Sequence, residues 1–114
     1  MTTSHDTGLW AESFAALALM LKGYRILTRR FKTPLGEIDL VAKRGRTVCF
    51  VEVKRRGTAR EGVEAIHAKN RARVAAAAAL YLQKHPGYSS MDTRFDAVIV
   101  APGAWPRHIP RAWG

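Results

Sequence analysis

GEIDLVAKRGRTVCFVEVKRR, residues 36–56, contains two runs of strand-forming residues joined by a short polar link with a glycine. The runs cover residues 37–42 and 47–54, and the link covers 43–46. This pattern is the usual signal for an antiparallel hairpin. Charged residues nevertheless interrupt both runs, with Asp39 in the first and Glu52 and Lys54 in the second. Because such side chains are rarely buried without partners, their presence in the runs needs an explanation.

Strand geometry indicates which of these charges can meet. Side chains alternate between the two faces of a strand, so the first run is predicted to carry two sets on opposite faces: Glu37 with Asp39, and Ile38 with Leu40. Glu52 and Lys54 share one face of the second run. Directly opposed residues in a hairpin have Cβ atoms about 5 Å apart. A register that pairs Asp39 near Glu52 would therefore bring two carboxylates together, but the pattern defines that register only to within about two residues.

Two neighbouring carboxylates repel each other unless a cation or a proton compensates them. Mg²⁺ prefers oxygen ligands and is usually held by one or two carboxylates, water and a substrate phosphate. Lys54, on the same face as Glu52, would then be placed to orient water or to offset charge on the phosphate. The plainer interpretation is an exposed sheet face on which the acids and the lysine form weak ion pairs.

Helical patterns lie on both sides of the hairpin. A first helix is predicted from about Gly8 to Gly23, with a core-facing stripe: Trp10, Phe14, Leu17 and Leu21. A second, alanine-rich helix is predicted at 59–84 and stops before Pro86, and its stripe consists of Val63, Ile66, Val74, Ala77 and Tyr81.

Further strands complete an αβββαβ order. They are predicted at 24–31, before a turn at 32–36, at 94–101, and as a short edge strand at 108–109. This order indicates an α/β fold with a mixed central sheet flanked by helices. The 114 residues, 47% of them hydrophobic, suit one domain. We expect residues 1–7 to be disordered and residues 8–114 to form that domain.

The positive charge is concentrated in one part of the chain. Nineteen Lys and Arg residues against nine Asp and Glu residues give a net charge of +10. Residues 22–73 contain fifteen of the basic and five of the acidic residues, so this segment carries the whole excess. Such a patch favours a polyanion such as nucleic acid, although a solvated face would look the same. A membrane surface is less favoured, because the basic residues are not on one amphipathic helix.

Cysteine and histidine give little indication of a redox or zinc site. Cys49 is the only cysteine, so an intramolecular disulfide is impossible. It is predicted to be a small core residue. The four histidines lack zinc-ligand spacing and are predicted to be surface or turn residues: His5, His67, His85 and His108. The apolar stretch 9–21 lacks a basic leader and is too short to cross a bilayer, so we expect a cytoplasmic protein.

Glu12 adds a third acid from outside the hairpin. It is the only charged residue between Leu9 and Leu21, and its helical neighbours are small or apolar. A carboxylate in such surroundings lies either at the edge of the helix in water or against a partner, and the sequence leaves both interpretations open.

These residues resemble the PD-(D/E)XK nuclease superfamily, whose restriction endonuclease-like core has the same αβββαβ order. More closely, the chain resembles the small bacterial YraN family of predicted endonucleases, which is distantly similar to archaeal Holliday junction resolvases. The resemblance extends from Gly8 to Trp113 and is carried by these stretches: residues 8–15 with Glu12, 23–27, 36–40, 50–55, 94–98 and 108–109, with Lys69, Tyr81 and Leu82.

The resemblance implies a phosphodiesterase site that uses Mg²⁺ or Mn²⁺. The implied metal ligands are Glu12, Asp39, Glu52 and the backbone carbonyl of Val53. Lys54 is the implied catalytic lysine, and the three acids belong to the same catalytic set. Ile38 replaces the proline of the superfamily motif, a change that leaves the Asp39 side chain unaffected. Glu37 is expected either to support the site or to pair with a nearby arginine, and not to take part in catalysis.

Four basic residues are candidates for nucleic acid binding. Arg55 and Arg56 follow the implied metal ligands directly and are expected to guide nucleic acid to the site. Lys69 and Arg73 are four residues apart on the second helix, so they face the same way and either contact phosphate or are simply solvated. The tryptophans of the tail could stack on bases, but packing against the sheet is favoured: Trp105 and Trp113.

The leading hypothesis is a metal-dependent endonuclease that hydrolyses phosphodiester bonds in branched or otherwise structured DNA. The competing hypothesis is a non-catalytic nucleic-acid-binding module that keeps the nuclease fold and binds without Asp39 or Glu52. An enzyme acting on RNA would use the same residues. By analogy with resolvase-like relatives, a homodimer is also possible.

Overall fold

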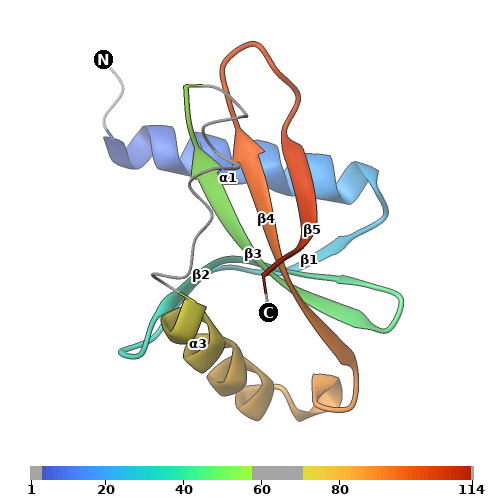
Figure 1. The fold of residues 1–114 in the computed structure, drawn as a ribbon. Coiled ribbons are helices and arrows are strands. Elements are labelled where there is room, and N and C mark those ends of the chain that lie inside the picture. Colours follow the sequence, from blue (N-terminus) through green and yellow to red (C-terminus); the bar gives the residue numbers. More distant parts are fainter. Residues whose placement is uncertain (1–3, 58–70, 114) are drawn as a thin grey trace.

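Figure 1 shows the protein in a computed structural model that describes residues 4–57 and 71–113. The first elements are α1 (Ser4–Leu21), β1 (Arg25–Lys32), β2 (Glu37–Arg44) and β3 (Thr47–Arg55). The later ones are α3 (Arg71–Lys84), the short 3₁₀ helix η2 (Pro86–Tyr88), β4 (Asp92–Val100) and β5 (Arg107–Trp113). The predicted αβββαβ order of a restriction endonuclease-like core is confirmed, and β5 extends it. Helix α1 begins earlier than the predicted start near Gly8.

The strands form one mixed sheet in the order β1-β2-β3-β4-β5. Only β3 and β4 run parallel, and the other neighbours are antiparallel. The predicted hairpin is confirmed as β2 and β3, joined by the two residues Gly45 and Arg46. Gly45 has a φ of 60°, which such tight hairpin turns require and which glycine adopts without strain. The predicted two-residue edge strand is the seven-residue β5.

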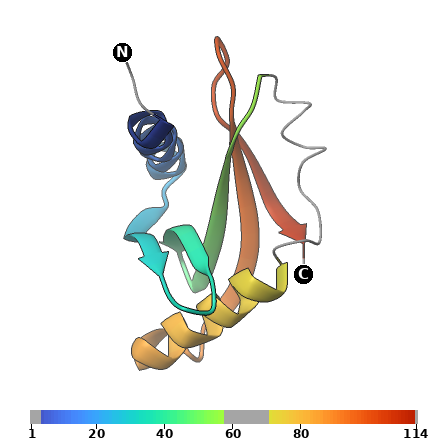
Figure 2. The same ribbon diagram turned by 90° about the vertical axis from the view of Figure 1, so that its left-hand side faces the viewer.

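The two helices pack on opposite faces of the sheet. Consecutive strand residues point to opposite faces, and they divide into two core clusters accordingly. Helix α1 packs on one cluster, which contains Leu40, Ala42, Cys49 and Val51, and α3 packs on the other, which contains Val41, Val48 and Phe50. Figure 2 shows the helices on separate sides of the hairpin formed by β1 and β2. Burial of Cys49 agrees with its predicted place in the core.

The predicted core-facing stripe of α1 is wrong except at Phe14, which packs against the core cluster under this helix. Trp10, Leu17 and Leu21 are 55%, 45% and 69% exposed. The buried residues of this helix are instead mostly alanines: Ala11, Ala15, Ala16 and Ala18, with Leu19. Small side chains let the helix backbone lie close to the sheet, which explains why the large ones remain outside. Neither this helix nor any other in the described part of the chain is long and apolar enough to cross a membrane.

Helix α3 agrees with prediction where it is described. Val74, Ala77 and Tyr81 are buried, as the stripe predicted, and Tyr81 also shares a hydrogen bond with Thr28 of β1. The other predicted stripe residues, Val63 and Ile66, lie outside the described residues.

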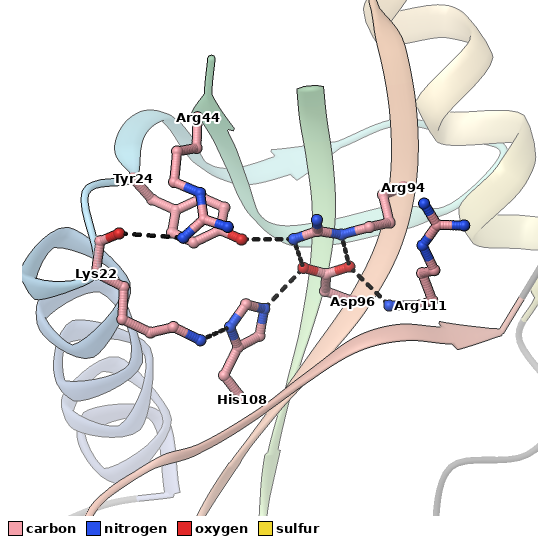
Figure 3. A network of polar contacts seen from close by, with 7 residues as sticks. All are labelled: Lys22, Tyr24, Arg44, Arg94, Asp96, His108 and Arg111. Atoms are coloured by element: carbon pink, nitrogen blue, oxygen red, sulfur yellow. Dashed lines mark hydrogen bonds and ion pairs between the residues drawn. The ribbon is translucent and has the colours of Figure 1, made fainter. Parts of the chain in front are cut away.

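A buried polar network joins β5 and the end of α1 to β4 (Figure 3). Asp96 is 1% exposed and accepts hydrogen bonds from four groups: Nε and Nη2 of Arg94, Nε2 of His108 and the amide of Arg111. Burial opposes ionisation of Asp96, but these bonds hold its pKa well below its ordinary value. The predicted surface position of His108 is therefore wrong, because its side chain is 5% exposed and lies between Asp96 and Lys22.

Candidate active site

Asp39 and Glu52 lie beside each other where β2 and β3 separate. Backbone pairing of the two strands ends at Leu40 and Val51, so Asp39 and Glu52 occupy the next position along each strand. There the amide of Val53 donates to Oδ2 of Asp39 at 2.8 Å, so a side chain takes the place of a backbone acceptor. Because the N–H and C=O of one strand residue point to the same edge, the Val53 carbonyl also faces this gap. The predicted proximity of Asp39 to Glu52 is confirmed.

Strand β2 twists at Asp39. Ile38 and Leu40 are two residues apart, yet they belong to core clusters on opposite sides of the sheet. The prediction that they share a face is therefore wrong. Side chains alternate regularly between the two faces only along a strand that has no sharp twist. The twist in β2 moves Asp39 to the boundary between the two faces. Across from it on β1, Arg30 has an unusual φ of 56°.

Two small pockets meet at this twist. The Arg73 pocket, of about 230 Å³, is lined by Glu37, Ile38, Asp39, Glu52, Arg73 and Val74. The Arg30 pocket, of about 270 Å³, includes Glu12, Arg30, Asp39, Val53, Arg55 and Arg56. Asp39 belongs to both, so a ligand in either pocket lies next to this carboxylate.

The Asp39 carboxylate is disfavoured as an anion. Burial is the main reason that its pKa rises from 3.8 to about 6, and the negative charges of Glu12, Glu52 and Glu37 add to the rise. The hydrogen bond from the Val53 amide opposes the rise without cancelling it. Burial and the neighbouring acids therefore make the Asp39 anion unfavourable, and a cation bound beside this carboxylate would offset that cost.

Two of the neighbouring acids already have basic partners. Lys54 Nζ lies 2.6 Å from Oε1 of Glu52, and both side chains are about four-fifths buried. Glu12 is 6% exposed, and both of its oxygens accept hydrogen bonds from Nε of Arg30, at 2.7 and 3.1 Å. Of the two interpretations left open for Glu12, a buried position against a partner is the correct one. Within residues 4–57 and 71–113, Asp39 has no ion-pair partner.

The donors available for a metal ion are fewer than the resemblance implied. No three Asp, Glu, His or Cys side chains in the described part of the chain are grouped closely enough to hold a metal. The remaining donor set consists of the Asp39 and Glu52 carboxylates and the Val53 carbonyl. One or two carboxylates, completed by water and a substrate phosphate, are typical of Mg²⁺ sites.

The basic candidates lie around the two pockets, with one exception. Arg73 lines the Arg73 pocket, and Arg55 and Arg56 line the Arg30 pocket. The Arg56 amide donates to the carbonyl of Val100 at 3.0 Å, which fixes the backbone just beyond β3. Lys69 lies outside the described residues.

The two tail tryptophans differ in their packing. Trp113 stacks on Phe95 with ring centroids 4.3 Å apart, which confirms the predicted packing against the sheet. Trp105 is 57% exposed and touches Phe14 of α1 edge to face, so its predicted packing against the sheet is wrong.

The sequence did not indicate two residues of the site. Arg30 is one of them, because the spacing of the arginines in β1 does not distinguish it from its exposed neighbour Arg29. Gly36 also helps to form the site, since a Cβ there would lie 2.3 Å from the carbonyl oxygen of Arg73. A glycine directly before the acidic strand was the available signal for such a close approach.

Comparison with known proteins finds relatives along nearly the whole chain. A family model described as "Uncharacterised protein family UPF0102" matches residues 11–100, which include Glu12, Asp39, Glu52 and Lys54. The UPF0102 protein of Methylorubrum extorquens (strain PA1) is 54% identical over 110 residues, covering 96% of this chain and 86% of the relative.

Other relatives agree with this match. The UPF0102 protein of Parvibaculum lavamentivorans is 49% identical over 110 residues, covering 96% of this chain and 83% of its own. UPF0102 protein RPA0323 of Rhodopseudomonas palustris is 50% identical over 107 residues, covering 94% and 82%. Because both the family model and these relatives cover most of the chain, the protein belongs to the YraN-like family UPF0102.

Proposed function

We propose that the protein is a metal-dependent endonuclease of the PD-(D/E)XK superfamily that hydrolyses phosphodiester bonds in branched or otherwise structured DNA. The observation that carries the proposal is the pair Asp39 and Glu52, held side by side where β2 and β3 separate. They line a pocket with Arg73, and a second pocket with Arg55 and Arg56 adjoins them. Acidic groups for a cation and basic groups for phosphate therefore meet in one place.

Mg²⁺ or Mn²⁺ fits the donor set that these residues offer. Asp39 and Glu52 would hold the ion together with the Val53 carbonyl, and the unfavourable charge on Asp39 supports such a ligand set. A bound Mg²⁺ would supply Lewis-acid stabilisation of the negative charge that develops on the phosphate.

The remaining groups bind the substrate and assist bond cleavage. In hydrolysis a water oxygen attacks phosphorus, one ester P–O bond breaks, the water loses a proton to solvent and the leaving oxygen gains one. Lys54 is held by Glu52 in a position to orient that water or to offset charge on the phosphate. Arg73, Arg55 and Arg56 would bind flanking phosphates.

Cleavage of defined DNA substrates tests the proposal. Linear, flapped and four-way DNA would be incubated with the wild-type protein and Mg²⁺ or Mn²⁺, and with Asp39→Asn and Lys54→Ala. Each substitution should lower the cleavage rate by about 100-fold or more, because Asp39 would hold the metal ion and Lys54 would orient the water or offset charge on the phosphate. Asp92→Asn and Lys84→Ala remove the same charges from exposed positions and should cleave like the wild type. Cleavage that survives both site substitutions would contradict the proposal.

Thermal unfolding separates the enzyme from a non-catalytic binding module. A ligand that binds only the folded state raises its Tm, so Mg²⁺ should raise the Tm of the wild type and not that of Asp39→Asn. A binding module would instead show salt-sensitive DNA binding that is independent of Asp39 and Glu52, with no shift in Tm.

A further inference from the structure

Arg30 differs from the other arginines of β1 in its backbone conformation. Its φ of 56° lies in the left-handed region, which residues other than glycine seldom adopt. It sits in the middle of the strand, across from Asp39 on β2. Strained conformations of this kind persist only where surrounding contacts hold them, and they are frequent at functional sites.

The side chain of Arg30 is held by the buried Glu12. A single nitrogen, Nε, donates to both carboxylate oxygens of Glu12, at 2.7 and 3.1 Å. The Arg30 side chain is 28% exposed, whereas that of Glu12 is 8% exposed. Within the described residues, the two Nη groups of Arg30 donate no hydrogen bond. The carboxylate therefore fixes the guanidinium while leaving its Nη donors available to a ligand.

The surroundings of Arg30 suit a phosphate. Arg30 lines the pocket of about 270 Å³ to which Arg55 and Arg56 also contribute. That pocket shares Asp39 with the pocket that contains Glu52 and Arg73. A guanidinium with free Nη groups can bind two phosphate oxygens in parallel, which a lysine cannot do.

We propose that Arg30 binds the phosphate next to the bond that is cleaved, and that Glu12 is a positioning residue for Arg30 and not a metal ligand. The inference rests on the proposed function, because it takes Asp39 and Glu52 as the metal site. It also narrows the substrate. The substrate must carry at least two successive phosphates, one in the Arg30 pocket and another at Asp39 and Glu52.

DNA binding without metal tests the role of Arg30. The affinity for a fluorescein-labelled four-way junction would be measured in EDTA over a series of salt concentrations. Arg30→Gln should weaken binding by about tenfold and lower the salt slope by about 1, as expected when one phosphate contact is lost. Arg30→Lys, which keeps the charge but not the planar fork, should lose less. Glu12→Gln should weaken binding by about threefold, because Gln holds Arg30 less firmly.

Arg29→Gln is the matched control. Arg29 is the preceding residue of β1, is exposed, and donates to Oγ of Ser13 at 2.8 Å outside both pockets. Its substitution removes the same charge and should change affinity by less than about twofold. Equal effects of Arg29→Gln and Arg30→Gln would overturn the inference. If Arg30→Gln does not fold because Glu12 loses its partner, the DNA affinities of Arg30→Lys and Glu12→Gln still test the inference, because both substitutions keep the size of the side chain.

The Mg²⁺-induced change in Tm tests the role of Glu12. Glu12→Gln should keep the wild-type shift, whereas Asp39→Asn should lose it. Loss of the shift in Glu12→Gln, with the wild type and Asp39→Asn behaving as proposed, would make Glu12 a metal ligand and overturn this inference alone. A wild type that neither binds DNA nor responds to Mg²⁺ would overturn the proposed function as well.

Discussion

Asp39 is the residue at which the demands of folding and of the proposed chemistry conflict. Its pKa is raised to about 6, chiefly by burial, from an ordinary 3.8. A group with a higher pKa in the folded state binds protons more tightly when the chain is folded. The contribution of Asp39 to the free energy of unfolding therefore decreases as pH rises from about 4 to about 6, and above that range the full cost of the buried anion is present.

Asp39→Asn should accordingly make the protein more stable at neutral pH. The amide oxygen can still accept from the Val53 amide, and the unfavourable charge is gone. We expect the free energy of unfolding to rise by about 1 to 2 kcal/mol at pH 7, somewhat less than the pKa shift alone implies because Asp39 is partly exposed. Urea unfolding at pH 7 and at pH 4 measures the effect, which should be much smaller at pH 4.

Asp92→Asn is the control for this prediction, since Asp92 is exposed at the start of β4. Its substitution should change stability little at either pH. If Asp39→Asn unfolds more easily than the wild type at pH 7, the ionised Asp39 carboxylate does not destabilise the folded protein and the prediction is wrong. Gained stability together with lost cleavage is the combination expected of an active-site residue.

At the same scale, the sequence predicted which acids meet but not how they are neutralised. The proximity of Asp39 and Glu52 follows from hairpin register, which is a local property of neighbouring strands. The pairing of Glu12 with Arg30 joins α1 to β1 and depends on a left-handed residue in mid-strand. No periodic pattern encodes such a conformation, so Arg30 looked like any other exposed arginine.

Helix α1 shows why an element can be recognised correctly and still be turned the wrong way. Its sequence is apolar almost all round, so two stripes compete for the core. The stripe with Trp10 and Leu17 has the larger side chains, but the alanine stripe is the one that is buried. Size alone does not decide such a choice, because close packing of a helix on a sheet favours small residues at the contact.

Gly36 controls how closely α3 approaches the hairpin. The turn before β2 lies against the helix backbone, and a Cβ at Gly36 would be 2.3 Å from the Arg73 carbonyl oxygen. Backbone atoms cannot move aside cheaply, so Gly36→Ala should lower the free energy of unfolding by about 1 to 3 kcal/mol. Displacement of α3 would also widen the Arg73 pocket and lower DNA cleavage. Urea unfolding and a cleavage assay measure the two effects.

Gly87→Ala is a matched control, because a Cβ at Gly87 would meet open space. It should leave both stability and cleavage close to those of the wild type. If Gly36→Ala were as stable as Gly87→Ala, the contact between the turn and α3 would not limit their approach.

For the whole molecule, the fold was predictable because a strong hairpin signal and the order of the elements leave few topologies. The side-chain contacts that join distant segments of the chain were not predictable. The buried network around Asp96 links β4, β5 and the end of α1, and its members are separated by up to 86 residues. Its histidine was expected at the surface, since burial of this kind depends on contacts that sequence spacing does not reveal.

The charge of +10 belongs to the whole chain, but the proposed site uses only part of it. Arg55 and Arg56 line the Arg30 pocket, whereas Arg25 and Arg46 are exposed at the other end of strands β1, β2 and β3, near the Gly45 turn. The double substitution of Arg55 and Arg56 by Gln should weaken DNA binding about tenfold or more. It should also reduce the salt slope by about 2, as expected for two lost phosphate contacts.

The double substitution of Arg25 and Arg46 by Gln removes the same net charge from the far end of these strands. If the positive charge acts locally, this variant should keep most of the wild-type affinity and salt slope. Fluorescence anisotropy with a labelled four-way junction, titrated at several salt concentrations, measures both quantities. Equal losses in the two double variants would mean that binding depends on total charge, and the basic residues around Asp39 and Glu52 would then have no special part in guiding DNA to the site.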